Sequence, residues 1–222
     1  MKYILLTAAL IWAAAAFSAE ESDTPELNAN TDVPAGVEKV FVVYNEGFAA
    51  SWVTRIIRQE TRSNFVWQDT LLGAYFGIQT RNLRPFDITV RLSAYYPLAA
   101  TFNKHPQPAA SPLHFALDLY AAPIVRLSLW DYVFVNVSAG PHFFFQNADR
   151  WNYAHLGIGA LAGFELPVAR RWTILLDGMA SFDYGNLGAN RTIEPFDYVW
   201  QYQVSLGVRY SKKGENRYSY IP

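Results

Sequence analysis

The sequence predicts an all-β fold, an eight-stranded antiparallel transmembrane up-and-down β-barrel with short periplasmic turns and longer outer loops. Two observations predict it. Eight segments between about residues 38 and 211 alternate between apolar and polar residues, which is the period of a β-strand. In seven of them the apolar phase has no Asp, Glu, Lys, Arg or His, so one face of the sheet suits hydrocarbon rather than water.

The composition supports one membrane domain and excludes several other classes of protein. The chain has 222 residues, with 14 Tyr, 15 Phe and 7 Trp, and a net charge of −1. A chain this close to neutral has no basic field to attract nucleic acid, so we expect no nucleic-acid partner. The absence of cysteine excludes disulfides, thiolate catalysis and cysteine metal sites.

The ends of the chain are predicted to lie outside the barrel. Lys2 precedes an apolar run, and Ala16 and Ser18 are small residues placed for cleavage, so residues 1–18 are predicted to be a signal peptide. A short membrane anchor is the alternative, although the run is shorter than the roughly 20 residues that a spanning helix needs. Residues 19–37 are acidic and poor in large apolar groups, which predicts a flexible periplasmic leader, or an acidic segment with a binding role. Residues 212–222 are predicted to be a periplasmic tail.

The strands differ in how clearly they alternate. The clearest are 86–98, where Ile88 and Leu92 alternate with Asp87 and Arg91, and 113–129. Further strands are expected at about 69–81, 133–146, 153–166, 172–184 and 198–211. The segment 38–59 completes the eight, but its alternation breaks near residues 45–47, which suggests a bulge there and leaves its facing open.

The predicted connections alternate in length. The short ones are 82–84, 130–131 and 167–171, and the longer polar ones are 59–65, 99–111, 146–152 and 185–195. Short turns at one end and longer loops at the other are typical of outer-membrane barrels. This asymmetry predicts that the N- and C-termini are periplasmic and that the longer loops are surface-exposed.

The polar phase of the strands predicts a charge network in the barrel interior. Its members are Asp87, Arg91, Asp118, Arg126, Glu165, Asp177 and Arg209, and Asp69, Arg81 and Asp183 share their phase. Because unpaired charges away from water are costly, we expect them to pair. Glycines on the same phase, including Gly157, Gly163 and Gly207, leave room for opposing side chains. Eight strands enclose a lumen that side chains can just fill, so a plugged core and a narrow permeation path both remain open.

Three residues are predicted to form a polar row at the outer mouth. Counting residues across the predicted turns sets His142 opposite His155, and His155 opposite Asp183, with His114 nearby. Two imidazoles and a carboxylate could bind a divalent metal or respond to pH. Ordinary cross-strand polar pairs are the simpler interpretation, so neither a metal nor a cofactor is predicted.

Five tryptophans fall near predicted strand ends: Trp67, Trp130, Trp151, Trp172 and Trp200. Tryptophan is enriched where a membrane meets water, which predicts an interfacial aromatic girdle. Ordinary packing residues are the alternative.

Across about residues 38–211 the chain resembles the small eight-stranded bacterial outer-membrane barrel proteins, the OmpW-like and OmpA/OmpX-like families. The resemblance rests on the export signal, the eight alternating segments and the loop asymmetry. Residues 203–210 (QVSLGVRY) also resemble the terminal-strand signal read by the barrel-assembly machinery.

The resemblance implies a location in the cell outer membrane of a diderm bacterium, among outer-membrane lipid. It also implies help from the barrel-assembly machinery and periplasmic chaperones during biogenesis. A resemblance to OmpW-like proteins implies a narrow porin through which small molecules, including hydrophobic ones, pass passively. OmpA/OmpX-like proteins imply instead a non-conducting adhesin or structural barrel that binds host surface or matrix proteins through its outer loops.

No enzymatic activity is predicted. The lipid A deacylases among small barrels use a His-x-Ser cluster on the barrel exterior. None of His105, His114, His142 and His155 has a serine two residues later. No catalytic residue is therefore assigned.

Overall fold

The computed structural model describes residues 41–58, 65–81, 86–103, 105–106, 113–130, 133–148, 152–169, 171–184 and 196–210. The chain divides into two compact units, Met1–Lys39 and Val40–Pro222, and every described residue belongs to the second. The predicted signal peptide, leader and tail therefore lie outside the described residues. Within the described ranges, no helix is long and apolar enough to cross a membrane.

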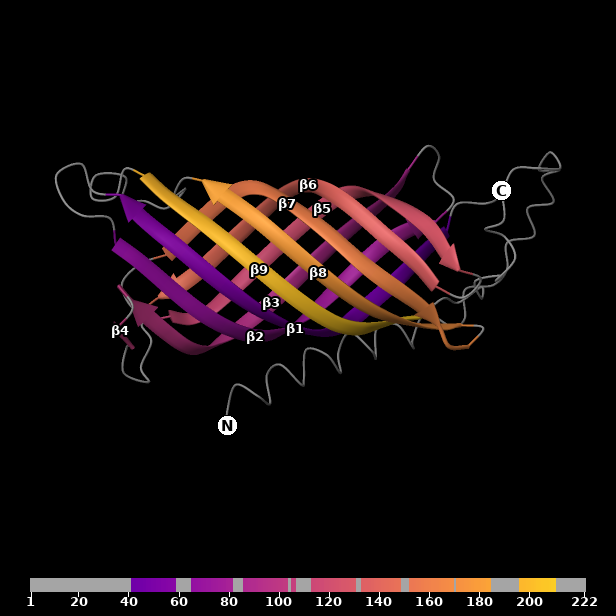
Figure 1. Cartoon of the computed structure of the whole chain (residues 1–222), viewed down its shortest axis with the longest axis horizontal. Coiled ribbons are helices and arrows are strands. Elements are labelled where there is room, and N and C mark those ends of the chain that lie inside the picture. Colours follow the sequence, from indigo (N-terminus) through magenta and orange to yellow (C-terminus); the bar gives the residue numbers. More distant parts are fainter. Residues whose placement is uncertain are drawn as a thin grey trace, which may run out of the picture. The chain divides into compact units, whose positions relative to one another are not determined.

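Eight long strands of the described chain form a closed antiparallel barrel (Figure 1). They are β1 (Phe41–Arg58), β2 (Phe65–Arg81), β3 (Asp87–Phe102), β5 (Leu113–Trp130), β6 (Val133–Ala148), β7 (Asn152–Pro167), β8 (Trp172–Tyr184) and β9 (Phe196–Tyr210). A two-residue strand, β4 (His105–Pro106), pairs with the end of β3. Each long strand pairs with its neighbours along the chain, and β1 pairs with β9 from Tyr44↔Tyr210 to Arg58↔Phe196. The predicted fold class is confirmed.

The two ends of the barrel differ in their connections. We call the end where β1 begins, β9 ends and the short connections lie the turn end, and the opposite end the loop end. Two predicted loops were too long. β6 reaches Ala148 and β7 begins at Asn152, with Asn147 paired to Asn152, so the segment 146–152 is mostly strand. β3 likewise runs through Phe102 into the predicted loop 99–111.

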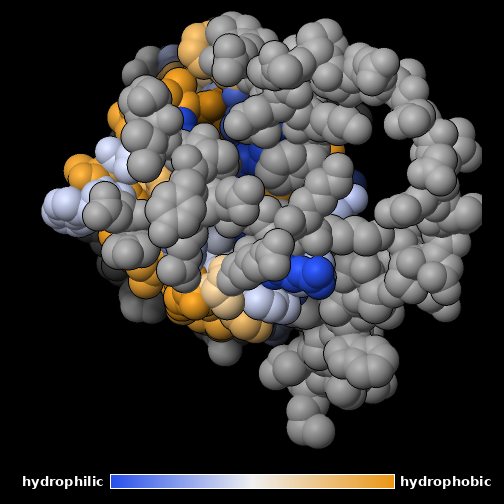
Figure 2. Space-filling model, turned by 90° about the vertical axis from the view of Figure 1, so that its right-hand side faces the viewer, coloured by the Kyte–Doolittle hydropathy of each residue, from blue (hydrophilic) through white to orange (hydrophobic). Residues whose placement is uncertain are grey.

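Side chains alternate between the lumen and the outer surface as the sequence predicts. In β8 every second residue from Thr173 to Asp183 is buried, and the residues between them are exposed. Among the strand residues whose side chains are described, no Asp, Glu, Lys or Arg is exposed, whereas large apolar side chains are exposed on every long strand. In Figure 2, hydrophobic residues gather along the outer edge of the wall, and several hydrophilic residues are visible between the grey atoms. This outer surface has the composition that hydrocarbon requires, because a charged group in lipid is costly.

Strand β1 corrects one prediction. It pairs with both β2 and β9 without a register shift, through Glu46↔Phe76 and Glu46↔Val208, so the predicted bulge at residues 45–47 is wrong. Asn45 is buried and Glu46 is partly exposed on the outer face. The alternation seemed to break only because a charged residue occupies an outward position of an otherwise regular strand.

Candidate functional site

The lumen is filled by polar side chains, and Glu165 is the centre of the group nearest the turn end. Its carboxylate is fully buried and lies 3.0 Å from Arg81 Nη2, 2.7 Å from Arg126 Nη2 and 2.6 Å from Arg209 Nη2. The amide nitrogen of Asn136 also donates to it. Several guanidinium groups around one carboxylate satisfy its lone pairs, which a buried charge requires. We call these five residues the Glu165 cluster.

A second ion pair lies next to this cluster, between Arg91 and Asp177. Arg91 Nη1 lies 3.4 Å from Asp177 Oδ2, and the Arg91 guanidinium carbon lies 3.6 Å above the centre of the Tyr75 ring. A guanidinium over an aromatic face is favourable by electrostatic attraction to the ring. The arginine is thus held from two directions inside the lumen.

A third group joins two carboxylates through one imidazole. His142 Nδ1 lies 2.7 Å from Asp183 Oδ1, and His142 Nε2 lies 3.5 Å from Asp118 Oδ2. Ser181 donates to Asp183 Oδ2 at 3.1 Å, and Gln201 donates to Asp118 Oδ2 at 3.0 Å. All five residues are buried. We call them the His142 group.

Gln203 links the His142 group to the Arg91–Asp177 pair. In the amide orientation that satisfies both of its ends, its oxygen accepts from Arg91 Nη2 at 2.6 Å. Its nitrogen then donates to Asp118 Oδ2 at 3.2 Å. A polar chain therefore extends along the lumen from Asp183 to Asp177.

The predicted histidine row is wrong in its register. His142 pairs with Gly157 rather than His155, and Asp183 also pairs with Gly157. His155 pairs with Phe144, two residues closer to the loop end, and its ring stacks on that of Tyr153. His142 and Asp183 therefore meet directly, with Gly157 rather than His155 on the strand between them. His114 is exposed at the start of β5.

Within the described residues, no group of three or more His, Cys, Asp or Glu side chains is arranged to hold a metal ion.

An apolar layer lies on the loop-end side of the His142 group. It consists of Ala49, Val53, Leu71, Tyr95, Ala116, Phe144 and Val199, all of them buried. Tyr75 belongs to the same apolar cluster but lies beside Arg91, nearer the turn end. The Phe144 ring stacks on His142, with 6.4 Å between ring centres. The lumen thus changes from polar to apolar along its length.

Polar side chains appear again at the loop end. Asp69 accepts from Trp67 Nε1 at 2.9 Å and from Gln146 Nε2 at 3.2 Å. Arg55 lies 3.4 Å above the centre of the Tyr153 ring. The prediction that Trp67 belongs to an outward-facing girdle is therefore wrong, because Trp67 faces the lumen on the same side of β2 as Asp69.

The other tryptophans of the predicted girdle are exposed where they are described. The exposed residues are Trp130, Trp172 and Trp200, whereas Trp151 lies outside the described residues. The Trp172 ring packs against that of Tyr210 at 5.1 Å, and Trp200 packs against Phe182 at 4.6 Å. A role at the membrane interface stays a prediction.

Every member of the predicted interior network faces the lumen, and further side chains that were not predicted from the sequence complete it. Those are Asn45, Gln79, Asn136, Gln146, Gln201 and Gln203, together with Arg55 on β1. The amides lie on the lumen-facing phase of their strands, which is the signal that could have found them. Arg55 was missed because the facing of its strand was left open.

The barrel wall is not uniformly paired. The β3–β5 ladder runs from Asp87↔Ile124 to Tyr95↔Ala116, although β3 continues to Phe102 and β5 begins at Leu113. β3 instead pairs with β4 there, through Phe102↔His105. The neighbouring β5–β6 ladder reaches the loop end at Leu113↔Ala148. Among the described residues, the last part of β3 and residues 113–115 of β5 are thus not paired with each other.

Comparison with known proteins finds similar folds only. No family model and no curated protein matches the chain. Neisserial surface protein A has 13% identity and a TM-score of 0.49, with 78% of this chain and 99% of that chain covered. The outer membrane protein AlkL has 15% identity and a TM-score of 0.47, with 82% and 95% covered. OprG from Pseudomonas aeruginosa has 9% identity and a TM-score of 0.44, with 76% and 94% covered.

These three are small eight-stranded outer-membrane barrels, the group that the sequence resembles. The barrel fold itself rests on the strand pairing described above.

Proposed function

We propose that this chain is an outer-membrane barrel that passes small apolar molecules passively from its loop end into the lipid, through the wall between β3 and β5. The observation that carries the proposal is the early end of the β3–β5 ladder at Tyr95↔Ala116. Where two neighbouring strands are not paired, the wall can open sideways without breaking main-chain hydrogen bonds between them.

The apolar layer supports this route. Tyr95 and Ala116, the last pair of the ladder, belong to the apolar layer inside the barrel. On the outer face at the same level, Tyr96, Leu98 and Phe115 are exposed. An apolar molecule could therefore keep contact with apolar groups from the lumen to the lipid, which the hydrophobic effect favours.

The polar lumen supports a sideways exit over passage along the whole barrel. Between the apolar layer and the turn end lie the His142 group, the Arg91–Asp177 pair and the Glu165 cluster. A solute crossing this part would have to separate buried ion pairs, which is costly. We therefore expect the refolded protein to carry no steady ionic current in a planar bilayer, and a steady current would contradict the proposal.

A second test uses a disulfide to join β3 and β5 at the end of their ladder. Because the chain has no cysteine, Tyr96→Cys with Phe115→Cys would place two thiols in positions that continue the Tyr95↔Ala116 register. Cross-linking them should slow the uptake of a small apolar fluorescent dye by cells that carry the protein in their outer membrane. Reduction of the disulfide should restore uptake.

The control is a second pair in the same ladder. Leu92 and Leu119 are paired and both exposed, so Leu92→Cys with Leu119→Cys cross-links a part of the wall that is already closed. Uptake should stay at the wild-type rate in this variant. Equal uptake with and without the 96–115 cross-link would rule out the sideways route.

Adhesion through the outer loops stays a prediction. Residues 185–195, together with 104 and 107–111 of the other predicted loop, lie outside the described residues. The prediction that the protein is not an enzyme is likewise still to be tested.

A further inference from the structure

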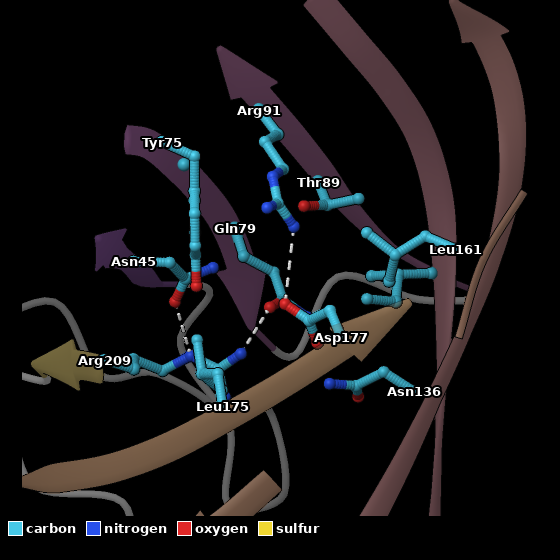
Figure 3. Close-up of a pocket in the computed structure, with 12 residues that line it drawn as sticks. Asn45, Tyr75, Gln79, Thr89, Arg91, Asn136, Leu161, Leu175, Asp177 and Arg209 are labelled. Atoms are coloured by element: carbon cyan, nitrogen blue, oxygen red, sulfur yellow. Dashed lines mark hydrogen bonds and ion pairs between the residues drawn. The ribbon is translucent and has the colours of Figure 1, made fainter. Parts of the chain in front are cut away.

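A small cavity lies in the polar half of the lumen, between the Arg91–Asp177 pair and the Glu165 cluster (Figure 3). Asn45, Tyr75, Gln79, Asn136 and Asp177 contribute to its lining. Its volume, as space open to the centre of a water molecule, is about 20 Å³. About 10–15 Å³ of such space holds one water, so the cavity has room for one or two.

Two amide side chains each have one end bound to an ionic group and the other end without a protein partner. Gln79 Oε1 accepts from Arg209 Nη2 at 2.8 Å, which leaves Gln79 Nε2 as a donor without a partner. Asn136 Nδ2 donates to Glu165, which leaves Asn136 Oδ1 as an acceptor without a partner. Both residues line the cavity and are almost fully buried, with 1% and 3% of their surface exposed. The hydrogen bonds to Arg209 and Glu165 determine which atom of each amide has no protein partner.

The hydroxyl group of Tyr75 is a third polar group of the lining without a protein partner. Its ring is held under Arg91. A buried polar group that makes no hydrogen bond costs roughly 1–3 kcal/mol, so three of them around one cavity point to a ligand that satisfies them.

The chemistry of the lining decides which ligand fits. A bare anion would be repelled by the Asn136 carbonyl oxygen and the Asp177 carboxylate, and a bare cation by Arg91 and Arg209. A molecule that both donates and accepts hydrogen bonds can bind both Gln79 Nε2, a donor without a protein partner, and Asn136 Oδ1, an acceptor without one. We propose that this cavity is a binding site for one or two ordered water molecules, held by Gln79, Asn136 and Tyr75.

The proposal can be tested by nuclear magnetic resonance on the full-length mature barrel in lipid nanodiscs. Magnetisation transfer from water should reach the side-chain amide protons of Gln79. Gln146 is the internal control, because it is equally buried but its amide nitrogen donates to Asp69. A water signal at Gln79 that is lacking at Gln146 is the expected result. No water signal at Gln79 in the wild-type protein would overturn the proposal.

A cavity-filling variant gives an independent test. A Cβ added at Gly77, which also lines the cavity, would meet its nearest atoms at 3.4–3.6 Å, which is ordinary contact. Gly77→Ala should therefore fold, occupy part of the cavity and remove the water signal at Gln79. Gly178→Ala is the matched control, because Gly178 faces outward with its nearest atoms at 3.9–4.0 Å. The signal should survive in Gly178→Ala, and its survival in Gly77→Ala would overturn the site.

If Gly77→Ala does not fold, Tyr75→Phe replaces it, because this change removes one anchoring hydroxyl and keeps the ring. The water signal at Gln79 should then weaken. An unchanged signal would exclude Tyr75 from the site and overturn the three-residue proposal.

Discussion

His142 Nδ1 lies 2.7 Å from Asp183 Oδ1 although a whole strand, β7, separates their strands in the sheet. The residue of β7 that pairs with both of them is Gly157. Because glycine has no side chain, the two groups meet directly inside the lumen. The contact between His142 and Asp183 thus depends on the absence of a side chain at Gly157.

We first predict that Gly157→Ala destabilises the barrel. An added Cβ would overlap the backbone of Phe182 and Asp183. Overpacking of a filled interior costs about 1–3 kcal/mol in the free energy of unfolding. Urea unfolding in lipid vesicles measures it, and Gly178→Ala on the open outer face is the control. Equal unfolding midpoints for the two variants would contradict the packing described at Gly157.

His142→Ala should destabilise the protein more strongly. Its removal leaves Asp118 and Asp183 buried without the imidazole between them. Removing one member of a buried ion pair costs about 3–5 kcal/mol. A double-mutant cycle with Asp183→Asn checks the cause, since the two changes should be less than additive. Strict additivity would mean that the two residues do not interact.

Glu165→Gln should be among the most damaging conservative changes in the lumen. The variant leaves Arg81, Arg126 and Arg209 around a neutral amide, at a cost of about 3–5 kcal/mol in unfolding free energy. Asp87→Asn is the matched control, because Asp87 lies 3.7 Å from Arg81 and its side chain is 17% exposed. The control should cost less than about 1 kcal/mol. A larger loss from Asp87→Asn than from Glu165→Gln would contradict the central place of Glu165.

The lipid-facing surface can be tested by placing a charge on it at two depths. Val204 in the middle of β9 and Val168 at the turn end are equally exposed, at 49% and 50%. Val204→Arg should lower the free energy of unfolding by about 2–4 kcal/mol in phospholipid vesicles, and Val168→Arg by about 0–1 kcal/mol. If both substitutions are tolerated equally, the outer surface does not face hydrocarbon.

The direction in which each side chain points could be predicted from the sequence, because it depends only on local alternation. Asp177 and Glu165 face the lumen for this reason alone. Glu46 shows the limit of that argument, since a single charge at an outward position looked like a break in the strand. The pairing of β1 with both β2 and β9 shows that the strand is regular there.

The partner of each side chain could not be predicted in the same way, because register depends on where the strands end. β6 and β7 continue to Ala148 and Asn152, and this moves Gly157 to the place predicted for His155. A shift of two residues keeps every side chain on its face but changes its neighbours. The water-binding roles proposed for Gln79 and Asn136 could not be predicted for another reason. They depend on which amide atom of each residue is hydrogen-bonded to Arg209 or Glu165, and the sequence does not give these contacts.

The pairing of β1 with β9 has a consequence for how the molecule forms. This ladder joins residues from opposite ends of the barrel sequence, as in Tyr44↔Tyr210. Its closure must therefore wait until the last strand has been synthesised, and contacts this distant in sequence form slowly. Until then β1 keeps an unpaired edge, which invites association with other chains. A chain shortened before β9 should accordingly accumulate as aggregates rather than as a smaller barrel.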